Sequence, residues 1–345
     1  MEAVQSEEHK GYQINIYYDE VPQSPREWDN VATFVCNHRR YDLGDRQDMD
    51  DCIDELFDKH VNAKDVVAYF IKSRNARWVR NGTEDYDGPY DKYLEWNDGK
   101  DYFGVDDNTP DEDLAYNYIN DELTNGEKLM LVEESGNVAI LPISMYDHSG
   151  ITLWLGSTQG HVDARWDCSS VGFAYIEKSK AEEEMPQHTQ LPDIDNTDWK
   201  EWAYEMMEGE MHTYDQYVRG NVYGWVVENG EDDFEDSCWG YIGDDEISRM
   251  IEEAKDAIDY HLKRKEEERK ENCKVLAEHI NDFIGHTWLW KDESYRIGHD
   301  LFGNGCLEKA VVHLDHVAPY SYVNISDVEA DVLDCILNYI NKKIA

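Results

Sequence analysis

The stretch KLMLVEESGNVAILPISMYDHSGITLWLG (residues 128–156), followed by VGFAYIEK (171–178), decides how this chain folds. Its short apolar runs are separated by Gly, Asn, Asp and Ser, which is the pattern of β-strands joined by turns. VYGWVVENG and DSCWGYIG (222–243) continue the pattern and predict a β-hairpin. Toward the N-terminus, Tyr12, Ile14 and Ile16 alternate with polar residues, which predicts a further strand.

Helical periodicity surrounds these strands. Apolar residues recur at helical spacing in five segments: 48–61, 111–123, 197–220, 244–284 and 327–343. Two shorter apolar runs, 31–38 and 65–74, fit either a strand or a helix. The sequence therefore predicts a mixed α+β fold with antiparallel β-sheet segments, several amphipathic helices and a long helix near 244–284.

Composition shifts along the chain suggest four parts. We expect an N-terminal α+β unit (1–80), an acidic, aromatic-rich insertion (81–136), a β-rich core with an acidic helix and the hairpin (137–260), and a helical C-terminal unit (261–345). The insertion is interrupted repeatedly by Gly and Pro, which favour turns over long elements.

Charge is the strongest functional signal. The 345 residues include 76 acidic and 32 basic residues, which gives a net charge of −44. Such a chain would repel nucleic-acid backbones and anionic membranes, so both are excluded as direct ligands. Aromatic residues make up 12% of the chain, which argues against a disordered acidic tail. Most of the excess lies in two windows, with net charge −14 over 81–136 and −20 over 182–259.

Cysteine usage and targeting signals point to a reduced compartment. Seven cysteines are scattered without a CxxC pair, and no apolar run approaches the ~18 residues of a membrane helix. The N-terminus MEAVQSEEHKGYQ is acidic and lacks the apolar core of a signal peptide. We therefore expect a cytoplasmic protein.

Motifs for catalysis and metal binding are weak. The acidic loops 193–205 and 106–114 lack the glycine that a calcium loop of the EF-hand type needs at its sixth position. A structural zinc site usually needs two closely spaced pairs of ligands. The chain has the isolated pairs Cys36 with His38 and His313 with His316, and neither is matched by a second pair of the required spacing. There is no GxSxG elbow and no P-loop. We expect no metal, no cofactor and no enzymatic activity.

The segment SPREWDNVATFVCNHRRYDLGD (24–45) combines Trp28 with several charges. A structural interpretation is an ion-paired junction in which Arg39 or Arg40 forks onto Asp29 or Asp42. A ligand site is the alternative.

Several motifs in the chain resemble a family of uncharacterised accessory proteins of bacteriophages and mobile elements. They are REWDN…CNHRRYDLGD (26–45), YDHSG (146–150), WDCSSVGFAYIEKSKA (166–181) and YDQYVRGNVYGWVVE…DSCWGYIGD (214–244). YRIGHDLF (295–302) also resembles a short phage-protein motif. The resemblance implies a phage or mobile-DNA setting in the cytoplasm of a bacterial host, and it supplies no catalytic residues. In charge, the chain is similar to DNA-mimic antirestriction and anti-CRISPR proteins.

These observations predict an anti-defence protein that acts as an acidic DNA mimic. It would occupy the basic nucleic-acid channel of a host defence nuclease or of its DNA-binding subunit, because opposite fields steer such an encounter. The candidate acidic face takes residues from both windows: Asp106, Asp107, Asp111, Glu112, Asp113, Glu231, Asp232, Asp233, Glu235 and Asp236.

Aromatic residues among the acids would add contacts or form core: Tyr86, Tyr90, Tyr93, Trp96, Tyr102, Trp199, Trp202 and Tyr204. Two alternatives stay open, namely a shape-specific inhibitor of a defence complex and a small-molecule-cleaving anti-defence enzyme. A homodimer is also open.

Overall fold

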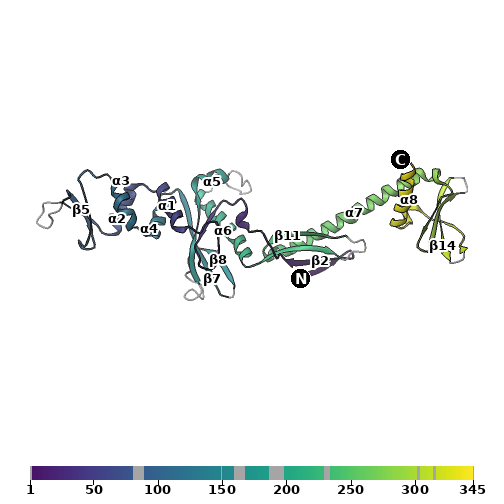
Figure 1. The fold of residues 1–345 in the computed structure, drawn as a ribbon, viewed down its shortest axis with the longest axis horizontal. Helices are drawn as coiled ribbons and strands as arrows, with labels where there is room; N and C mark the ends of the chain where they lie inside the picture. Colours follow the sequence, from purple (N-terminus) through teal and green to yellow (C-terminus); the bar gives the residue numbers. More distant parts are fainter. Residues whose placement is uncertain are drawn as a thin grey trace. The chain divides into compact units, whose positions relative to one another are not determined.

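The computed structural model describes residues 2–80, 89–148, 150–158, 168–185, 198–228, 234–300, 304–313 and 316–344. Within these ranges the chain forms two compact units. Unit 2 comprises Tyr18–Gly224 and Trp239–Ile247, and unit 1 comprises Met1–Tyr17, Trp225–Cys238 and Ser248–Ala345. The described elements are helices and four sheets, so the predicted α+β class is confirmed (Figure 1). The four-part division proposed above stays a prediction.

Unit 2 is built on a four-stranded sheet with the order β3-β9-β7-β8. Its strands are β3 (Thr33–Cys36), β9 (Cys168–Glu177), β7 (Val138–Asp147) and β8 (Ile151–Leu155), all paired antiparallel. The undecided segment 31–38 is therefore a strand. Its side chains alternate between two cores, with Phe34 in one and Val35 in the other.

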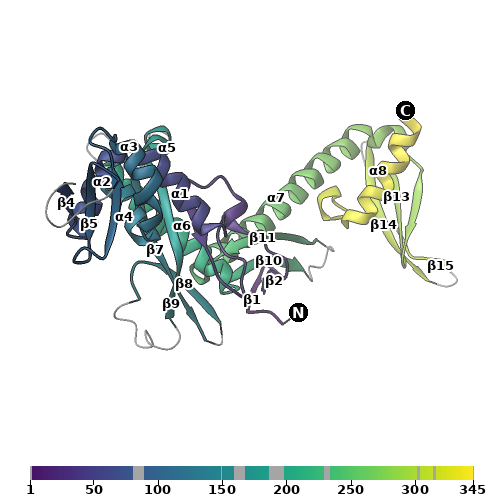
Figure 2. The same ribbon diagram turned by 60° about the vertical axis from the view of Figure 1, so that its left-hand side comes forward.

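Helices cover both faces of this sheet (Figure 2). On one face, α6 (Trp199–Val218) packs Trp202, Met207 and Met211 into the core, beside α5 (Lys178–Glu184). On the other face lie α1 (Met49–His60), α2 (Ala63–Ser73) and α4 (Asn125–Glu134). The undecided segment 65–74 belongs to α2, because Val66, Val67 and Phe70 fall on one helical face and are buried.

The sequence predicts a strand for KLMLVEE (128–134), but this prediction is wrong, because the segment belongs to helix α4. The helix begins with a capping box, in which the Thr124 hydroxyl accepts from the Glu127 backbone N–H and the Glu127 carboxylate accepts from the Thr124 N–H. This local device satisfies two helix-end donors and starts the helix four residues before the apolar run.

The acidic window 81–136 contains regular structure, and its sheet includes one strand that lies just before the window. Strands β4 (Arg77–Arg80), β5 (Lys92–Trp96) and β6 (Asp101–Val105) form an antiparallel sheet in that order. The predicted helix 111–123 is broken into three turns: α3 (Asp111–Leu114), a π-helical turn η2 (Ala115–Ile119) and a 3-10 turn η3 (Asn120–Glu122).

Unit 1 contains most of a second four-stranded sheet, β1-β2-β10-β11. Its strands are β1 (Gln5–His9), β2 (Tyr12–Tyr18), β10 (Val222–Glu228) and β11 (Asp236–Ile242), so the predicted hairpin segments are neighbours. The long helix α7 (Ile247–His279) follows and buries Met250, Ile251, Ala254 and Ile258. Its early turns are tied to the N-terminal hairpin, since Lys255 pairs with Glu7 (2.8 Å) and Lys10 pairs with Asp259 (2.8 Å).

The C-terminal part is only partly helical. Between α7 and α8 (Ala330–Ile344) lie β12 (Thr287–Trp290), β13 (Glu293–His299), β14 (Gly305–His313), β15 (His316–Val317) and β16 (Ser321–Tyr322). The end of α7, strands β12, β13 and β14, and α8 share one apolar core. The C-terminal part is therefore not the wholly helical unit that the sequence led us to expect. Tyr295 and Ile297 alternate with polar residues, as residues of a strand do.

Candidate partner-binding surface

Helix α1 presents a row of carboxylates. Its apolar residues Cys52, Ile53, Leu56 and Phe57 face the core, which leaves the remaining positions for charge. Asp50 and Asp51 lie in the first turn, where the helix dipole favours anions. Asp50, Asp51, Asp54 and Asp58 are all exposed. Helix packing therefore turns this part of the sequence into an acidic ridge.

A second group of acids lies on α3. Asp111, Glu112 and Asp113 form its first turn, directly after Pro110, while Leu114 and Ala115 are buried. Glu112 and Asp113 are exposed, and Asp111 is half-buried. The π-helical turn that follows leaves Tyr116 with 78% of its surface exposed. Such turns are uncommon and are frequent at functional sites.

The two groups meet at one cavity of about 380 Å³, between the end of α1, the start of α2 and the α3–η2 segment. Asp58, Glu112 and Asp113 line it, together with the exposed Tyr116. Phe57, Val61 and Val66 supply apolar lining, and none of the residues recorded around the cavity is basic. We use the name α1–α3 acidic surface for the carboxylates of both elements, namely the exposed Asp50, Asp51, Asp54, Asp58, Glu112 and Asp113 with the half-buried Asp111.

Some of these charges have partners. Asp54 pairs with Lys128 (2.6 Å), and Asp50 accepts a hydrogen bond from Asn125 (2.7 Å). At the start of α1, Arg46 bridges Asp48 and Glu55, and these hydrogen bonds hold the pKa of both carboxyl groups below its ordinary value. The charge of the ridge is therefore partly compensated near its N-terminal end.

The predicted residues Asp106 and Asp107 follow β6. Both are exposed, but Asp107 pairs with Arg80 (3.4 Å), and its carbonyl accepts from Lys92 (3.1 Å). Asp107 is consequently a weaker candidate than Asp106.

The second half of the predicted face lies elsewhere in the chain. Glu235 and Asp236 belong to unit 1 and are exposed at the start of β11, whereas the first window belongs to unit 2. Next to them, Phe234 stacks on His261, with ring centroids 4.0 Å apart. Glu231, Asp232 and Asp233 lie outside the described residues.

The aromatic residues divide between core and surface. Tyr93 and Trp202 are buried, and Trp96, Trp199 and Tyr204 are half-buried. Tyr90 and Tyr102 are exposed on the outer face of the β4–β6 sheet, each packed edge-on against Tyr93. Tyr86 lies outside the described residues. Within this set, Tyr90 and Tyr102 are the aromatic side chains with the largest surface for a partner.

The segment 24–45 forms an ion-paired junction, but with members other than those predicted. Arg26, only 5% exposed, forks onto Asp45 (3.0 and 2.7 Å) and also donates to Glu210 (2.7 Å). Burial lowers the pKa of Arg26, but its hydrogen bonds to the two carboxylates raise it further, so the net shift is upward. Arg40 pairs instead with Asp147. Since Arg26 is buried and its charge is paired, this junction ties the segment before β3 to α6.

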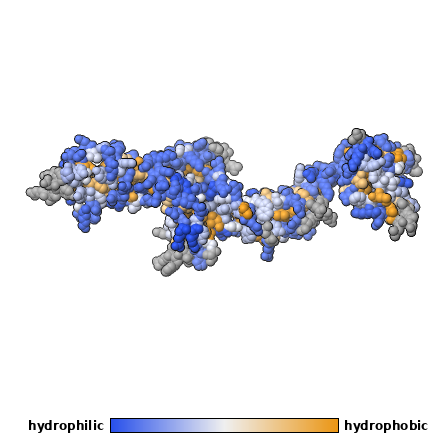
Figure 3. Space-filling model, viewed as in Figure 1, coloured by the Kyte–Doolittle hydropathy of each residue, from blue (hydrophilic) through white to orange (hydrophobic). Residues whose placement is uncertain are grey.

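Metal binding and membrane insertion have no structural support in the part of the chain described. Those residues contain no group of three or more His, Cys, Asp or Glu arranged to hold a metal ion. The acidic loop at 106–114 is among them, whereas 193–197 is not. No described helix has the length and apolar character needed to cross a membrane. In Figure 3, the visible surface is mostly hydrophilic, with small separate apolar patches.

Sequence reasoning found the acids of α3 but missed Asp58 and the cavity it shares with them. The signal for the ridge was present, because DMDDCIDELFDKHV is amphipathic with acids on its polar face. The sequence held no signal for the cavity, since the cavity depends on how α2 and η2 pack.

No protein-family model matches this chain, and no curated protein or solved structure matches it either.

Proposed function

We propose that unit 2 is an acidic decoy that occupies the basic nucleic-acid channel of another protein. In the phage or mobile-element setting that the sequence motifs imply, the partner would be a host restriction or CRISPR-type nuclease, or its DNA-binding subunit. The observation that carries the proposal is the cavity lined by Asp58, Glu112 and Asp113, whose lining includes no basic residue.

Carboxylates along the α1 part of the α1–α3 acidic surface are spaced a little under half as densely as the phosphates of duplex DNA. Asp50, Asp51, Asp54 and Asp58 span eight helical steps, or about 12 Å at ~1.5 Å per residue. That spacing gives about one carboxylate per 4 Å, against about one phosphate per 1.7 Å of duplex. Unit 2 as a whole contains 48 acidic and 18 basic residues, a net charge of −30. Its field would therefore attract a cationic groove over a range set by the ionic strength.

The cavity fits the side chains that such a groove carries. Lys and Arg bury an aliphatic stem against apolar surface and keep the charged head among polar groups. Phe57, Val61 and Val66 offer that apolar surface, and the three carboxylates line the same cavity. Tyr116, which is exposed, adds contact area, and a tyrosine side chain loses little conformational entropy on binding.

Capture from a bacterial lysate tests the proposal. Immobilised protein is incubated with lysate at about 50 mM and at about 500 mM salt, and the retained protein is challenged with duplex DNA. A decoy should retain a DNA-binding protein at low salt, release it at high salt, and lose it to the duplex. A partner that resists both salt and DNA would instead indicate a shape-specific inhibitor.

A charge-matched pair of variants then locates the surface on the captured partner. The first variant combines Asp58→Asn, Glu112→Gln and Asp113→Asn. The control combines Glu267→Gln, Glu268→Gln and Glu271→Gln, which removes the same charge from the mixed-charge part of α7. We expect the first to weaken binding at least about tenfold and the control to change it less than about twofold. Equal losses would mean that only total charge matters.

A further inference from the structure

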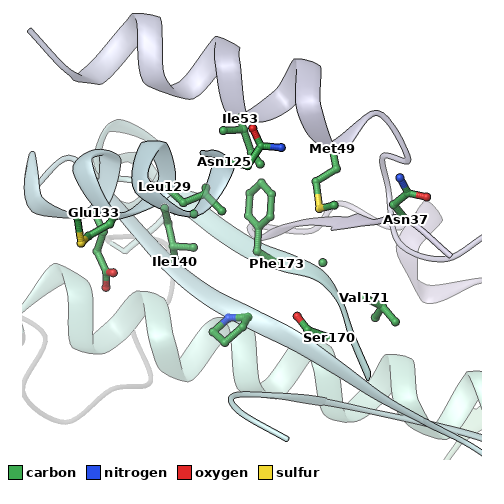
Figure 4. Close-up of a pocket in the computed structure, with 14 residues that line it drawn as sticks. Asn37, Met49, Ile53, Asn125, Leu129, Glu133, Ile140, Ser170, Val171 and Phe173 are labelled. Atoms are coloured by element: carbon green, nitrogen blue, oxygen red, sulfur yellow. The ribbon is translucent and has the colours of Figure 1, made fainter. Parts of the chain in front are cut away.

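A second cavity, of about 430 Å³, lies on the face of the central sheet of unit 2 that α1 and α4 cover. Figure 4 shows its walls: Met49 and Ile53 come from α1, Asn125, Leu129 and Glu133 come from α4, and Ile140, Ser170 and Phe173 come from β7 and β9. Its volume lies within the ~300–1,000 Å³ typical of small-molecule sites. We call it the α1–α4 groove.

The middle of the groove is apolar. Phe173 and Ile53 are almost fully buried beneath it, while Met49, Leu129 and Ile140 are half-buried along its sides. A β-bulge in the pairing of β7 and β9 falls between Ile143 and Ser144, directly beside this wall. Bulges re-aim side chains and are common next to binding sites.

The charge that lines the α1–α4 groove is negative. Glu133 is the one charged residue among those that line it, and it lies at one end, away from Asn37 (Figure 4). Burial, the negative charge of Glu133 and a hydrogen bond with that carboxylate raise the pKa of Tyr204. Lys200 reaches the main-chain carbonyl of Glu133 (3.5 Å) but does not line the groove.

We propose that the α1–α4 groove binds a small organic cation, with an apolar body over Phe173 and an ammonium or guanidinium group beside Glu133. The lining offers apolar contact, neutral amides and one carboxylate, and unit 2 carries a net charge of −30. An anion of the same shape would be repelled by both. This inference does not depend on the proposed function.

Three probes with one apolar body test the charge preference. 4-Phenylbutylammonium, 4-phenylbutanol and 4-phenylbutyrate are titrated separately into the full chain at 0.15 M salt and followed by ligand-observed NMR. We expect the cation to bind with a dissociation constant of about 1 mM or tighter, the alcohol more weakly, and the acid not measurably. No binding by the cation, or equal binding by the acid, would overturn the proposal.

A matched pair of variants tests whether the cation binds in the α1–α4 groove. Ser170 lines the groove and is exposed, so Ser170→Phe should fill it and abolish binding of the cation. Ser169 is also exposed but pairs with Met145, whose side chain belongs to the core on the opposite face of the sheet. Ser169→Phe should therefore leave binding unchanged, and equal effects of the two variants would contradict this site.

Glu133→Gln separates the charged end from the apolar body. It should weaken the cation about fivefold and leave the alcohol within about twofold, because the lost contact is an exposed ion pair. Thermal unfolding of each variant checks that it folds. Cation binding that is unchanged in Glu133→Gln would overturn the assignment of the charged end.

Discussion

At the scale of single residues, Gly172 is the position with the tightest steric requirement in the central sheet. It lies opposite Cys36 of β3, and a Cβ atom built there would fall 1.8 Å from the Val35 carbonyl oxygen. The obstacle is backbone rather than a flexible side chain, so β3 would have to move away from β9. This glycine allows the close approach of the two strands.

We predict that Gly172→Ala lowers the free energy of unfolding by about 1–3 kcal/mol. Gly209 is a matched control, because it lies within α6 with open space around it. Gly209→Ala should raise the free energy by about 0.5–1 kcal/mol, since alanine is the better helix former. Urea unfolding of both variants measures the difference, and a neutral Gly172→Ala would show that β3 adjusts freely.

Buried thiol and phenol groups, among them Cys36 and Tyr214 of one core, make the stability of the protein sensitive to alkali. Burial raises the pKa of the Cys36 thiol from 9.0 to about 12, and burial also raises the pKa of Tyr214 from 10.0 to about 12. Both groups stay protonated in the folded protein at a pH where the unfolded chain ionises. The folded state therefore binds more protons, and stability must fall as pH rises.

We expect the free energy of unfolding to decrease between about pH 9 and pH 12. Cys36→Ala should make that decrease shallower, whereas Cys238→Ala, at an exposed position, should not. Denaturant unfolding at a series of pH values measures the slopes. Identical slopes for the two variants would rule out Cys36 as a source of the effect.

The sequence predicted that the segment 24–45 forms ion pairs, but it could not predict which residues pair. The cluster 24–45 predicted that Arg39 or Arg40 pairs with Asp29 or Asp42. Ion pairing occurs, but Arg26 pairs with Asp45 and Glu210, and Arg40 pairs with Asp147. Glu210, one of the partners of Arg26, lies 184 positions away on α6. Charge pairing across such separations is decided by how elements pack, which local pattern does not encode.

At the scale of elements, α7 changes character along its length. Its buried residues end at Ile258 and resume at Leu276, and the turns between them contain no buried residue. Pairs such as Lys270 with Glu266 (2.6 Å) and Lys263 with Glu267 (4.0 Å) line this middle segment. Between residues 263 and 272 the helix is polar on all sides, and there it depends more on such i,i+4 pairs than on packing.

We predict that backbone amides of 259–275 exchange hydrogen faster than those of 249–258. Local opening needs little free energy where no side chain is buried. Raising the salt concentration to about 1 M should speed exchange in the middle segment further, because it screens the ion pairs. Hydrogen exchange followed by mass spectrometry tests this, and uniform protection along α7 would contradict it.

Elements differed in how well sequence predicted them. The amphipathic α1 and α6 were predicted because their apolar faces repeat regularly. Helix α4 was missed, although its Thr124–Glu127 capping box is legible in the sequence, because four consecutive apolar residues resemble a strand. The α3–η2–η3 break had no signal, and it is this break that places Tyr116 beside the acids.

At the scale of the whole molecule, both units carry an acidic excess. Unit 2 has a net charge of −30 over 216 residues, and unit 1 has a net charge of −14 over 129 residues. Self-repulsion of this size destabilises a compact state, and added salt weakens it by shortening the screening length from about 30 Å at 0.01 M to about 10 Å at 0.1 M.

We therefore expect the melting temperature to rise with sodium chloride over this range. Each kcal/mol gained corresponds to about 2–4 °C for a domain of this size. Scanning calorimetry at constant pH measures the shift, and an equal concentration of a neutral solute controls for osmotic effects. A melting temperature that falls with salt would mean that the ion pairs outweigh the repulsion.

The order of strands in the N-terminal sheet has a consequence for how the protein is made. Strand β2 ends at Tyr18, and its neighbour β10 begins at Val222, about 200 residues later. At 5–20 residues per second, a ribosome needs roughly 10–40 s to deliver that partner. The β1–β2 hairpin waits through this interval with an open edge, and an isolated hairpin is barely stable in water. Nascent chains should therefore complete the central sheet of unit 2 first and capture their own N-terminus late in synthesis.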